Sequence, residues 1–554
     1  MTQTAPAQLI PLPEDFPVTW DPPGDQSLYW FWDQMHHPHA VTPMTASLDG
    51  VAFAEGIARA CEAMHMPMGR SIMRAYNSYV YFTQVPRQES VEEAAQRDER
   101  MMAEMMSRAP RVLRDWEDVY LPEVMALNGR LRDYPYAEAT PRALADLMEE
   151  AVANRIRQWD LHFLAVFPAM GAALQFAELY EETFGPAPDN EHYRMLQGFP
   201  NKSVEAGQVL YDLAQELKRV PAVAGMIREA PAERFFAELE RTAAGKQAAE
   251  RLRGYLDVYG WRSDQFELAD PSWREDPRPM IYSLRAYFGE DATDPRIEQE
   301  KAAREREALV SEMLARVDGD AAKRNPLQMM HSMAQQYLPV MENHNFYIDQ
   351  MNTVLMRLPV LEIGRRLTAE GALNDPNDAF MLTITEAQDA VLKPDHTLTA
   401  LVAHRKEELA HWSRIVPPPF IGTQPAESIR DDVMDRFWGL NNEPSRDPKV
   451  ITGKGASRGL VTAPAKVVRS LAEADKLEQG DVLVCEMTMP PWTPLFSTAS
   501  AVVADSGGVL SHCAIVAREY GIPCVVGTRV GTRRIRDGQM LTVDGAKGIV
   551  RIEG

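Results

Sequence analysis

The chain has 554 residues, of which 45% are hydrophobic and 25% charged, and its formal net charge is -22. This length exceeds what one hydrophobic core usually holds, so we expect several domains. The negative charge argues against a nucleic acid or an anionic membrane as the main partner. No run of about 18 apolar residues occurs, and the N-terminus lacks the basic start and apolar core of a signal peptide, so we expect a cytoplasmic protein.

The first part of the chain predicts a mainly helical body over residues 1–438. Residues 1–45 are rich in proline and aromatic residues, which indicates an irregular, lid-like segment laid over that body. From about residue 50 the apolar residues recur every three or four positions, the helix period, as in 90–120 and 296–317. Ser90 and Glu93 have the spacing of a capping box, which places a helix start there.

A change of pattern near residue 440 predicts a linker over 439–449 and a separate small domain over 450–554. Residues 450–554 carry 12 Lys and Arg against 10 Asp and Glu, so the body holds the net negative charge. Short apolar runs separated by glycines predict strands, with a helix at about 511–520. The predicted strands are 460–468, 481–486, 501–505, 523–527 and 540–545.

Two further patterns limit the chemistry of the chain. The glycine-lysine cluster 453–459 lacks the spacing of a phosphate-binding loop, and we expect a turn that opens the small domain. Neither a Walker A pattern nor a GxGxxG between strand and helix occurs, so no nucleotide pocket is visible. The four cysteines form no CxxC pair, and we expect reduced thiols. They are Cys61, Cys485, Cys513 and Cys524.

His512 stands at the expected start of the helix 511–520, after Gly507, Gly508 and Ser511. A histidine in such a place is often only a partly buried capping residue. Here the two glycines leave room for a ligand, and the helix N-terminus offers unpaired N–H groups that favour a phosphoryl dianion. The same dipole disfavours an imidazolium ring, so the imidazole stays nucleophilic. These features favour a phosphoryl acceptor over a capping role.

The stretch GGVLSHCAIVAREYGIP resembles the active-site motif of the swivelling domain of the phosphoenolpyruvate-utilising and dikinase family. The resemblance extends over most of 450–554. It implies a multidomain fold in which a large, mainly α substrate-binding body precedes a small β/β/α phosphohistidine domain. His512 would then be the phosphorylated residue, supported by Gly507, Gly508 and Ser511. Leu510 stands where pyruvate-linked members usually have Thr, which resembles the rifampicin-phosphotransferase branch.

The order of domains points to a two-component aryl kinase such as phenylphosphate synthase. Only 42 residues follow His512, so we expect no phosphoenolpyruvate-binding barrel after it. The resemblance implies that a partner ATP-grasp subunit binds ATP and Mg²⁺ and phosphorylates His512, leaving AMP and phosphate. The small domain then swings about the linker and passes the phosphoryl group to a phenolic hydroxyl in the helical body. No cofactor is expected to stay bound to this chain.

The acceptor site calls for a base, a cation and an apolar slot. In 342–350, Glu342, His344 and Tyr347 recur at helical spacing. His344 is the expected base, and Tyr347 is expected to contact the substrate. A polar helix face satisfied by its own contacts is the alternative interpretation. Arg262 is the expected phosphate clamp, although a surface ion pair would explain it equally well.

The histidines of 36–39 are the remaining candidates. His37 and His39 are the candidates for contact with the substrate, and the aromatic residues near them in sequence indicate a packed lid. No set of Cys or carboxylate residues completes a zinc site there, so we expect no metal.

Three other functions stay open. The chain could be the corresponding part of a rifampicin-phosphotransferase-like antibiotic kinase, or a phosphocarrier fed by phosphoenolpyruvate. It could also be a scaffold with a decayed swivelling domain, which the intact histidine motif disfavours.

Overall fold

The computed structural model describes residues 8–187, 190–289, 292–424, 445–489 and 492–553. The chain divides into two compact units, each assembled from separate stretches of sequence. Unit 1 comprises Met1–Pro168, Gln265–Asp270 and Tyr347–Arg430. Unit 2 comprises Ala169–Asp264, Pro271–Phe346 and Asp431–Gly554.

Unit 1 contains a five-stranded antiparallel sheet in the order β1-β5-β2-β4-β3. Its strands are β1 (Gln8–Leu9), β2 (Tyr29–Trp32), β3 (Met68–Tyr76), β4 (Tyr79–Pro86) and β5 (Phe420–Gln424). The β3–β4 hairpin turns at Asn77 and Ser78, whose φ angles of 52° and 64° are those of a type I′ turn. The segment 1–45, expected to be irregular, thus contributes β1 and β2 to this sheet.

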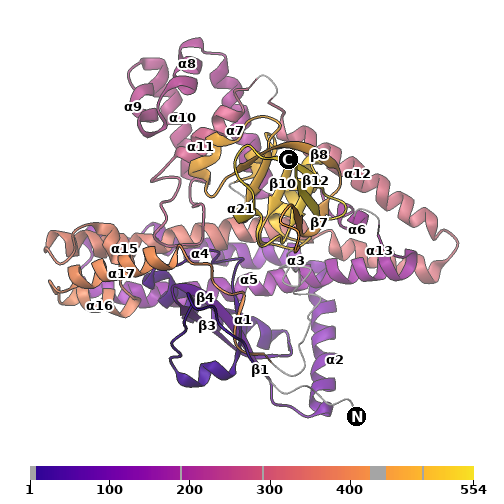
Figure 1. The fold of residues 1–554 in the computed structure, drawn as a ribbon, viewed down its shortest axis with the longest axis horizontal. Coiled ribbons are helices and arrows are strands. Elements are labelled where there is room, and N and C mark those ends of the chain that lie inside the picture. Colours follow the sequence, from indigo (N-terminus) through magenta and orange to yellow (C-terminus); the bar gives the residue numbers. More distant parts are fainter. Residues whose placement is uncertain (1–7, 188–189, 290–291, 425–444, 490–491, 554) are drawn as a thin grey trace. The chain divides into compact units, whose positions relative to one another are not determined.

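Helices make up the rest of unit 1 (Figure 1). They are α1 (Pro43–Ala63), α2 (Val91–Arg108), α3 (Val112–Asp115), α4 (Leu121–Arg132), α15 (Met351–Ala369), α16 (Ile384–Leu392) and α17 (Leu398–Trp412). The capping box is confirmed at the start of α2, where the Ser90 hydroxyl accepts from the Glu93 N–H and the Glu93 carboxylate accepts from the Ser90 N–H. Helix α5 (Pro141–Phe184) begins in unit 1 and continues into unit 2 beyond Pro168.

Helix α5 is also the single helix in the described ranges that is long and apolar enough to cross a membrane. Its most apolar stretch has a mean hydropathy of 1.4, and 72% of that stretch is buried inside the protein. Such burial is typical of a core helix.

Unit 2 begins with a helical part that precedes the small domain in sequence. Its helices are α6 (Glu191–Arg194), α7 (Lys202–Lys218), α8 (Pro221–Glu229), α9 (Phe235–Leu239), α10 (Ala243–Tyr259), α11 (Arg278–Ala286), α12 (Pro295–Arg316), α13 (Ala321–Ala334) and α14 (Tyr337–His344). Helix α12 coincides with the helix expected over 296–317. A π-helical turn (Asn345–Gln350) follows α14.

The C-terminal domain, residues 450–552, is built on an eight-stranded sheet in the order β6-β13-β12-β8-β9-β10-β11-β7. Strands β8 to β11 run parallel, and the other neighbours are antiparallel. The strands are β6 (Val450–Thr452), β7 (Lys454–Ser457), β8 (Leu460–Val467), β9 (Val482–Cys485), β10 (Ala501–Ala504), β11 (Cys524–Val526), β12 (Met540–Asp544) and β13 (Ile549–Ile552). Short helices α19 (Thr493–Phe496), α20 (His512–Tyr520) and α21 (Gly531–Arg534) complete the domain.

The structure confirms the predicted fold class, a largely helical body followed by a small domain that contains a sheet. All five predicted strands of the C-terminal domain are present, and so is the helix after His512. The turn expected at 453–459 is wrong, because 454–457 form β7, which pairs with β11. Gly455 lies so close to the Ala546 carbonyl that a Cβ would stand 2.6 Å from its oxygen, which explains the glycine.

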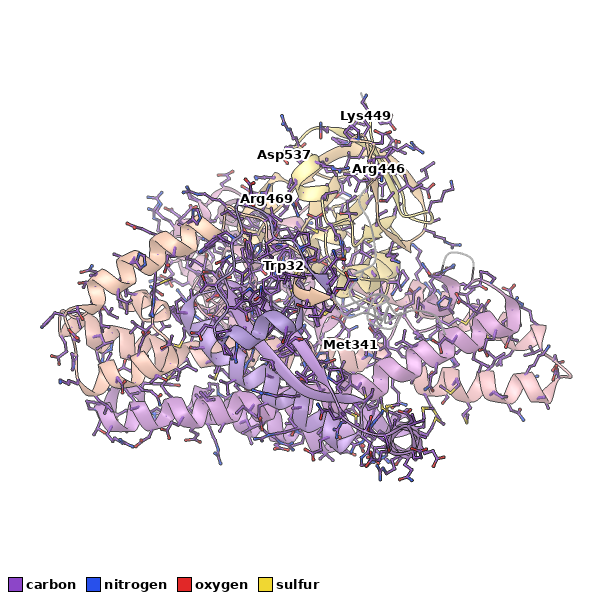
Figure 2. The ribbon with its side chains drawn as sticks, turned by 60° about the horizontal axis from the view of Figure 1, so that its bottom comes forward. Trp32, Met341, Arg446, Lys449, Arg469 and Asp537 are labelled. Atoms are coloured by element: carbon purple, nitrogen blue, oxygen red, sulfur yellow. The ribbon has the colours of Figure 1, made fainter. Side chains whose placement is uncertain are left out.

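The expected linker 439–449 falls largely outside the described residues, and the boundaries of the helical body and the C-terminal domain stay predictions. Arg446 and Lys449 lie just before β6, and Arg469 follows β8 (Figure 2). All four cysteines are free, as the sequence predicted, and all four are buried.

Candidate active site

His512 is the first residue of α20 and is held from outside its own domain. Its Nδ1 lies 2.9 Å from Oε1 of Glu342, on α14. The side chain of His512 is 12% exposed and that of Glu342 5%. Over the described part of the chain, the buried Nε2 of His512 has no hydrogen-bond partner. The Glu342 carboxylate therefore holds Nδ1, whereas Nε2 makes no hydrogen bond to the described residues.

Glu342 is a buried carboxylate that accepts two hydrogen bonds. Ser203, at the start of α7, donates its hydroxyl to Oε2 at 2.5 Å, and His512 donates to Oε1. Burial alone would raise the pKa of Glu342, but the charge of His512 and the hydrogen bonds from His512 and Ser203 hold it below its usual value. Glu342 is thus ionised at neutral pH and acts only as an acceptor.

This pairing sets the tautomer of His512. A carboxylate can only accept, so the proton of the imidazole sits on Nδ1 and the lone pair of the neutral ring sits on Nε2. A carboxylate that orients an imidazole and balances its positive charge is the arrangement of histidine-based catalysis. Nε2 is therefore the ring nitrogen that carries the lone pair of a neutral His512.

The loop before His512 is fixed on both sides. Ser511 caps α20 with its hydroxyl, and Gly507 has a φ of 97° with a Cβ position only 2.8 Å from the Ser511 side chain. The Tyr337 hydroxyl, on α14, donates to the Leu510 carbonyl at 2.8 Å. Arg518 donates to the Val509 carbonyl at 2.8 Å. Helix α14 thus holds both the loop and the histidine.

His344, the expected base, ends the same helix as Glu342. It is buried, and its Nδ1 donates to the Val340 carbonyl at 2.8 Å, which leaves the lone pair of the neutral ring on Nε2. The charge of His344 also contributes to the lowered pKa of Glu342. The structure therefore brings three of the predicted residues, His512, Glu342 and His344, into one electrostatic environment.

Arg262 is buried at 2% exposure, which excludes the surface ion pair. Its guanidinium lies over the rings of Trp273 and Phe346, at 5.2 and 4.9 Å from their centroids. Burial lowers the pKa of Arg262. In the described ranges, Nε and Nη2 have no hydrogen-bond partner. A buried guanidinium with idle donors is suited to an anionic ligand.

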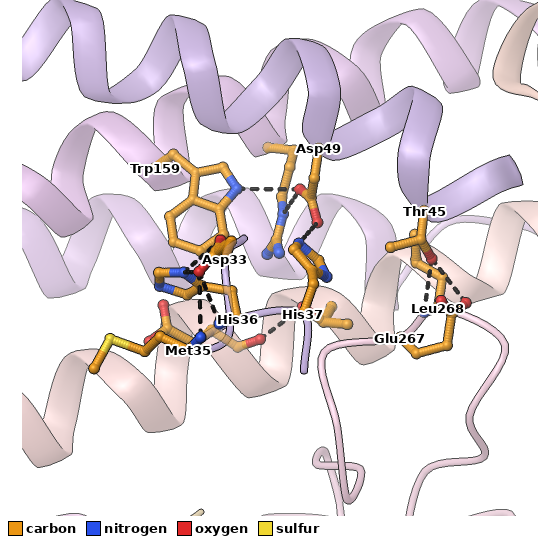
Figure 3. Close-up of polar contacts among 12 residues, drawn as sticks. Asp33, Met35, His36, His37, Thr45, Asp49, Trp159, Glu267 and Leu268 are labelled. Atoms are coloured by element: carbon orange, nitrogen blue, oxygen red, sulfur yellow. Dashed lines mark hydrogen bonds and ion pairs between the residues drawn. The ribbon is translucent and has the colours of Figure 1, made fainter. Parts of the chain in front are cut away.

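His36 and His37 belong to a buried charged network in unit 1 (Figure 3). His36 Nδ1 pairs with Asp33 at 3.0 Å. Burial would lower the pKa of His36, but the charge and hydrogen bond of Asp33, together with the charges of Asp349 and Asp49, raise it overall. His37 is 2% exposed, and burial lowers its pKa. His39 is half-buried.

Asp49, on α1, is the centre of this network. Its Oδ1 accepts from Arg155 Nε at 3.3 Å and from Trp159 Nε1 at 3.2 Å, and its Oδ2 lies 3.6 Å from His37 Nε2 (Figure 3). Arg155 also donates to Asn352 at 3.2 Å. Asp49 and Arg155 are each 1% exposed. This pair ties the first helix to α5 and α15.

We expect replacement of Asp49 by Ala to destabilise the fold by about 3–5 kcal/mol, because it leaves the Arg155 charge buried without its carboxylate. Thermal or denaturant unfolding of the variant measures the loss. Glu55→Ala is the matched control, since the Glu55–Arg59 pair on the same helix is half exposed, and it should cost at most about 1 kcal/mol. Equal losses in both variants would contradict the assignment.

Tyr347 lies in the π-helical turn Asn345–Gln350, at the point where unit 1 resumes. Its carbonyl accepts from Asn128 at 2.9 Å. Contact of Tyr347, His37 and His39 with a substrate stays a prediction. The sequence did not predict a role for three further residues, Ser203, Tyr337 and Arg518. Ser203 and Tyr337 meet the motif only through the tertiary fold, while Arg518 stands inside it as an apparently ordinary helix residue.

Two family models match parts of this chain. Residues 477–548 match the mobile domain of PEP-utilising enzymes, and residues 162–342 match the rifampicin phosphotransferase fourth domain. Glu342 is the last residue of the second match, and His512 lies within the first.

Three relatives extend the comparison. A chondramide synthase of Chondromyces crocatus is 33% identical over 566 residues, which cover all of this chain and 14% of that protein. An uncharacterized phosphotransferase of Bacillus subtilis is 30% identical over 435 residues, 78% of this chain and 51% of that protein. A rifampicin phosphotransferase of Streptomyces sviceus is 30% identical over 411 residues, 72% of this chain and 45% of that protein. The chain spans about half the length of the two phosphotransferases and a smaller part of the synthase.

The two matches together describe a small mobile domain joined to a helical body. The chain belongs to the family of PEP-utilising enzymes and dikinases, in its rifampicin-phosphotransferase-like branch.

Proposed function

We propose that this chain is the phosphotransfer part of an ATP-dependent, dikinase-like kinase in which His512 carries the phosphoryl group. The observation that supports this most directly is the 2.9 Å pairing of His512 Nδ1 with the buried Glu342, because it directs the lone pair of Nε2 outward from the pair. A partner ATP-grasp subunit, cytoplasmic like this chain, binds ATP and Mg²⁺.

In the first half-reaction Nε2 forms a bond to phosphorus. ATP, His512 and water give Nε2-phosphohistidine, AMP and inorganic phosphate. The proton stays on Nδ1, so the phosphorylated ring carries a positive charge that the Glu342 carboxylate balances when the two meet.

In the second half-reaction the P–N bond breaks and an O–P bond forms to the acceptor hydroxyl. The imidazole leaves as a neutral ring, because Nδ1 has kept its proton. His344 takes the hydroxyl proton on Nε2. Arg262 offers its idle donors to the phosphoryl oxygens, and catalysis rests on positioning and charge neutralisation.

The acceptor is a hydroxyl of an aromatic compound. A phenol accepted by a two-component aryl kinase is one candidate, since its proton is acidic enough for a histidine base. A rifampicin-like antibiotic is an equally supported second candidate, because residues 162–342 match a rifampicin phosphotransferase domain. The full-length similarity to part of a chondramide synthase also relates chains of this kind to a biosynthetic enzyme.

The test is labelling of the full chain with ATP carrying ³²P in the β-phosphate, in the presence of an ATP-grasp subunit. We expect one label per chain, labile in acid and stable in alkali, located at His512 by mass spectrometry. A chase with phenols, 4-hydroxyphenyl ketones or rifampicin then identifies the acceptor that removes the label. Stable labelling of His512 by phosphoenolpyruvate alone would contradict the ATP-dependent reaction.

Arg262→Met tests the phosphate clamp independently of turnover. We expect inorganic phosphate to raise the unfolding temperature of the wild type but not of the variant. Without phosphate the variant should be equally or more stable, by up to about 4 kcal/mol, because a buried charge without a partner is removed. Arg274→Met is the control, since Arg274 is exposed and pairs with Asp257. A phosphate effect that survives in Arg262→Met would exclude the clamp.

A further inference from the structure

Glu519 is a second buried carboxyl group on the helix that begins at His512. It stands seven residues after His512, about two helical turns, and so on the same side of α20. It is 8% exposed and lines a small cavity, with room for about one water molecule, between α20 and helices α7, α12 and α19. The other polar residues of this cavity are Ser203, Glu298, Gln299, Thr493 and Tyr520.

The groups around Glu519 favour its neutral form. The negative charge of Glu342, on α14, acts on it, while the Gly198 N–H and Arg518 offset only part of the effect of burial. Oε1 of Glu519 has no hydrogen-bond partner among the residues that the structure describes. Burial, followed by the Glu342 charge, raises the pKa of Glu519 to about 8.

Besides Glu519, the charged residue among those that line the cavity supplies no counter-charge. Glu298, on α12, lines the cavity and pairs with Lys301 at 3.2 Å. From α7 and α19 the cavity receives Ser203 and Thr493, which are uncharged. Tyr520, on α20 itself, has a raised pKa and stays neutral. A deprotonated Glu519 would therefore face Glu342 and Glu298 across a space with little water.

We propose that Glu519 is a positioning residue that couples the docking of the C-terminal domain onto helices α7, α12 and α14 to the uptake of one proton. This inference rests on the proposed function, because it assumes that the domain leaves the helical part during the reaction cycle. A neutral Glu519 lets the carrier histidine dock beside a single carboxylate, Glu342, and an ionised one opposes docking.

The sign of the pH dependence follows from the two states. After undocking, water reaches Glu519 and its pKa returns toward the usual 4.5, whereas in the docked state it is about 8. Docking is thus independent of this group below pH 4.5 and weakens as the pH rises toward 8, by at most about tenfold per pH unit. Asp264, which accepts from the Leu471 N–H at 3.0 Å, has a pKa of about 6 and acts with the same sign at lower pH.

The experiment measures docking directly in the full chain. Spin labels are attached to cysteines introduced at Lys547, in the C-terminal domain, and Glu250, on α10, both exposed. The four natural cysteines are buried, so labelling is selective. Between about pH 6.5 and 8.5, above the range of Asp264, we expect the ratio of docked to undocked chains to fall roughly 20-fold in the wild type. In Glu519→Gln and Glu519→Ala it should stay constant.

Controls separate this inference from the proposed function. Glu298→Gln changes the same cavity and should keep the pH dependence. His512→Asn should also keep the pH dependence of docking while it loses the phosphoryl label. Loss of the carrier function can therefore be distinguished from loss of the proton-coupled docking. Three outcomes would overturn the proposal. The ratio of docked to undocked wild-type chains could be independent of pH, or Glu519→Gln could keep the pH dependence. Glu519→Gln could also be undocked at every pH.

Discussion

We expect replacement of His512 by Asn to abolish labelling of the chain from β-³²P-ATP and phosphoryl transfer to the acceptor. Asn occupies a similar place at the start of α20 and can still hydrogen-bond Glu342, but it has no ring nitrogen with a nucleophilic lone pair. Nε2 is the atom that bonds phosphorus in both half-reactions, so nothing replaces it. We expect a loss of at least about 10³-fold, with the unfolding temperature nearly unchanged.

The matched control is His404→Asn, at an exposed position of α17 whose side chain is 67% exposed. It should label at the wild-type rate. Labelling is followed by quenching in alkali, where a phosphoramidate survives, and by counting the protein band. Residual label on the His512→Asn chain, with the same acid lability, would place the carrier on another histidine.

The C-terminal domain was predictable because its signals are local. Each predicted strand is a short apolar run that ends at a glycine or a polar residue, and the helix start is marked by Ser511 and His512 themselves. The error at 454–457 has a definite cause. Strand β7 consists of small and polar residues, and it forms because glycine permits a close approach to the chain at Ala546.

The sheet of unit 1 was not predictable in the same way. β2 and β5 are neighbours although almost 400 residues separate them, and no periodicity records such a pairing. The candidate site shows the same limit. Glu342 and His344 could be proposed from one short segment. The hydrogen bonds that Glu342 accepts from His512 and from Ser203, however, join residues more than 130 positions apart. The raised pKa of Glu519 likewise arises from burial in the tertiary fold, which could not be predicted from the sequence.

We expect Glu342→Gln to slow the second half-reaction and to leave the first one intact. Glu342 stands on the helical part, so it meets His512 only when the C-terminal domain is docked there. We therefore expect labelling by the ATP-grasp subunit to persist, while transfer from the phosphohistidine to the acceptor slows by about 10²–10⁴-fold. The amide keeps the shape of the side chain but removes the negative charge that balances the ring. Its amide N–H can also donate to Nδ1, which favours the tautomer with the proton on Nε2.

The measurement is the rate at which an acceptor discharges ³²P from the pre-labelled chain. Ser203→Ala, which removes one hydrogen bond but keeps the carboxylate, should slow the same step by only about tenfold. Glu305→Gln is the docking control, because Glu305 pairs with Arg458 of the C-terminal domain at 3.4 Å without touching His512. If Glu342→Gln discharged at the wild-type rate, the pairing would be a packing contact. If it lost labelling as well, Glu342 would be needed for folding or for the ATP half-reaction, and the step at which it acts would have to be reassigned.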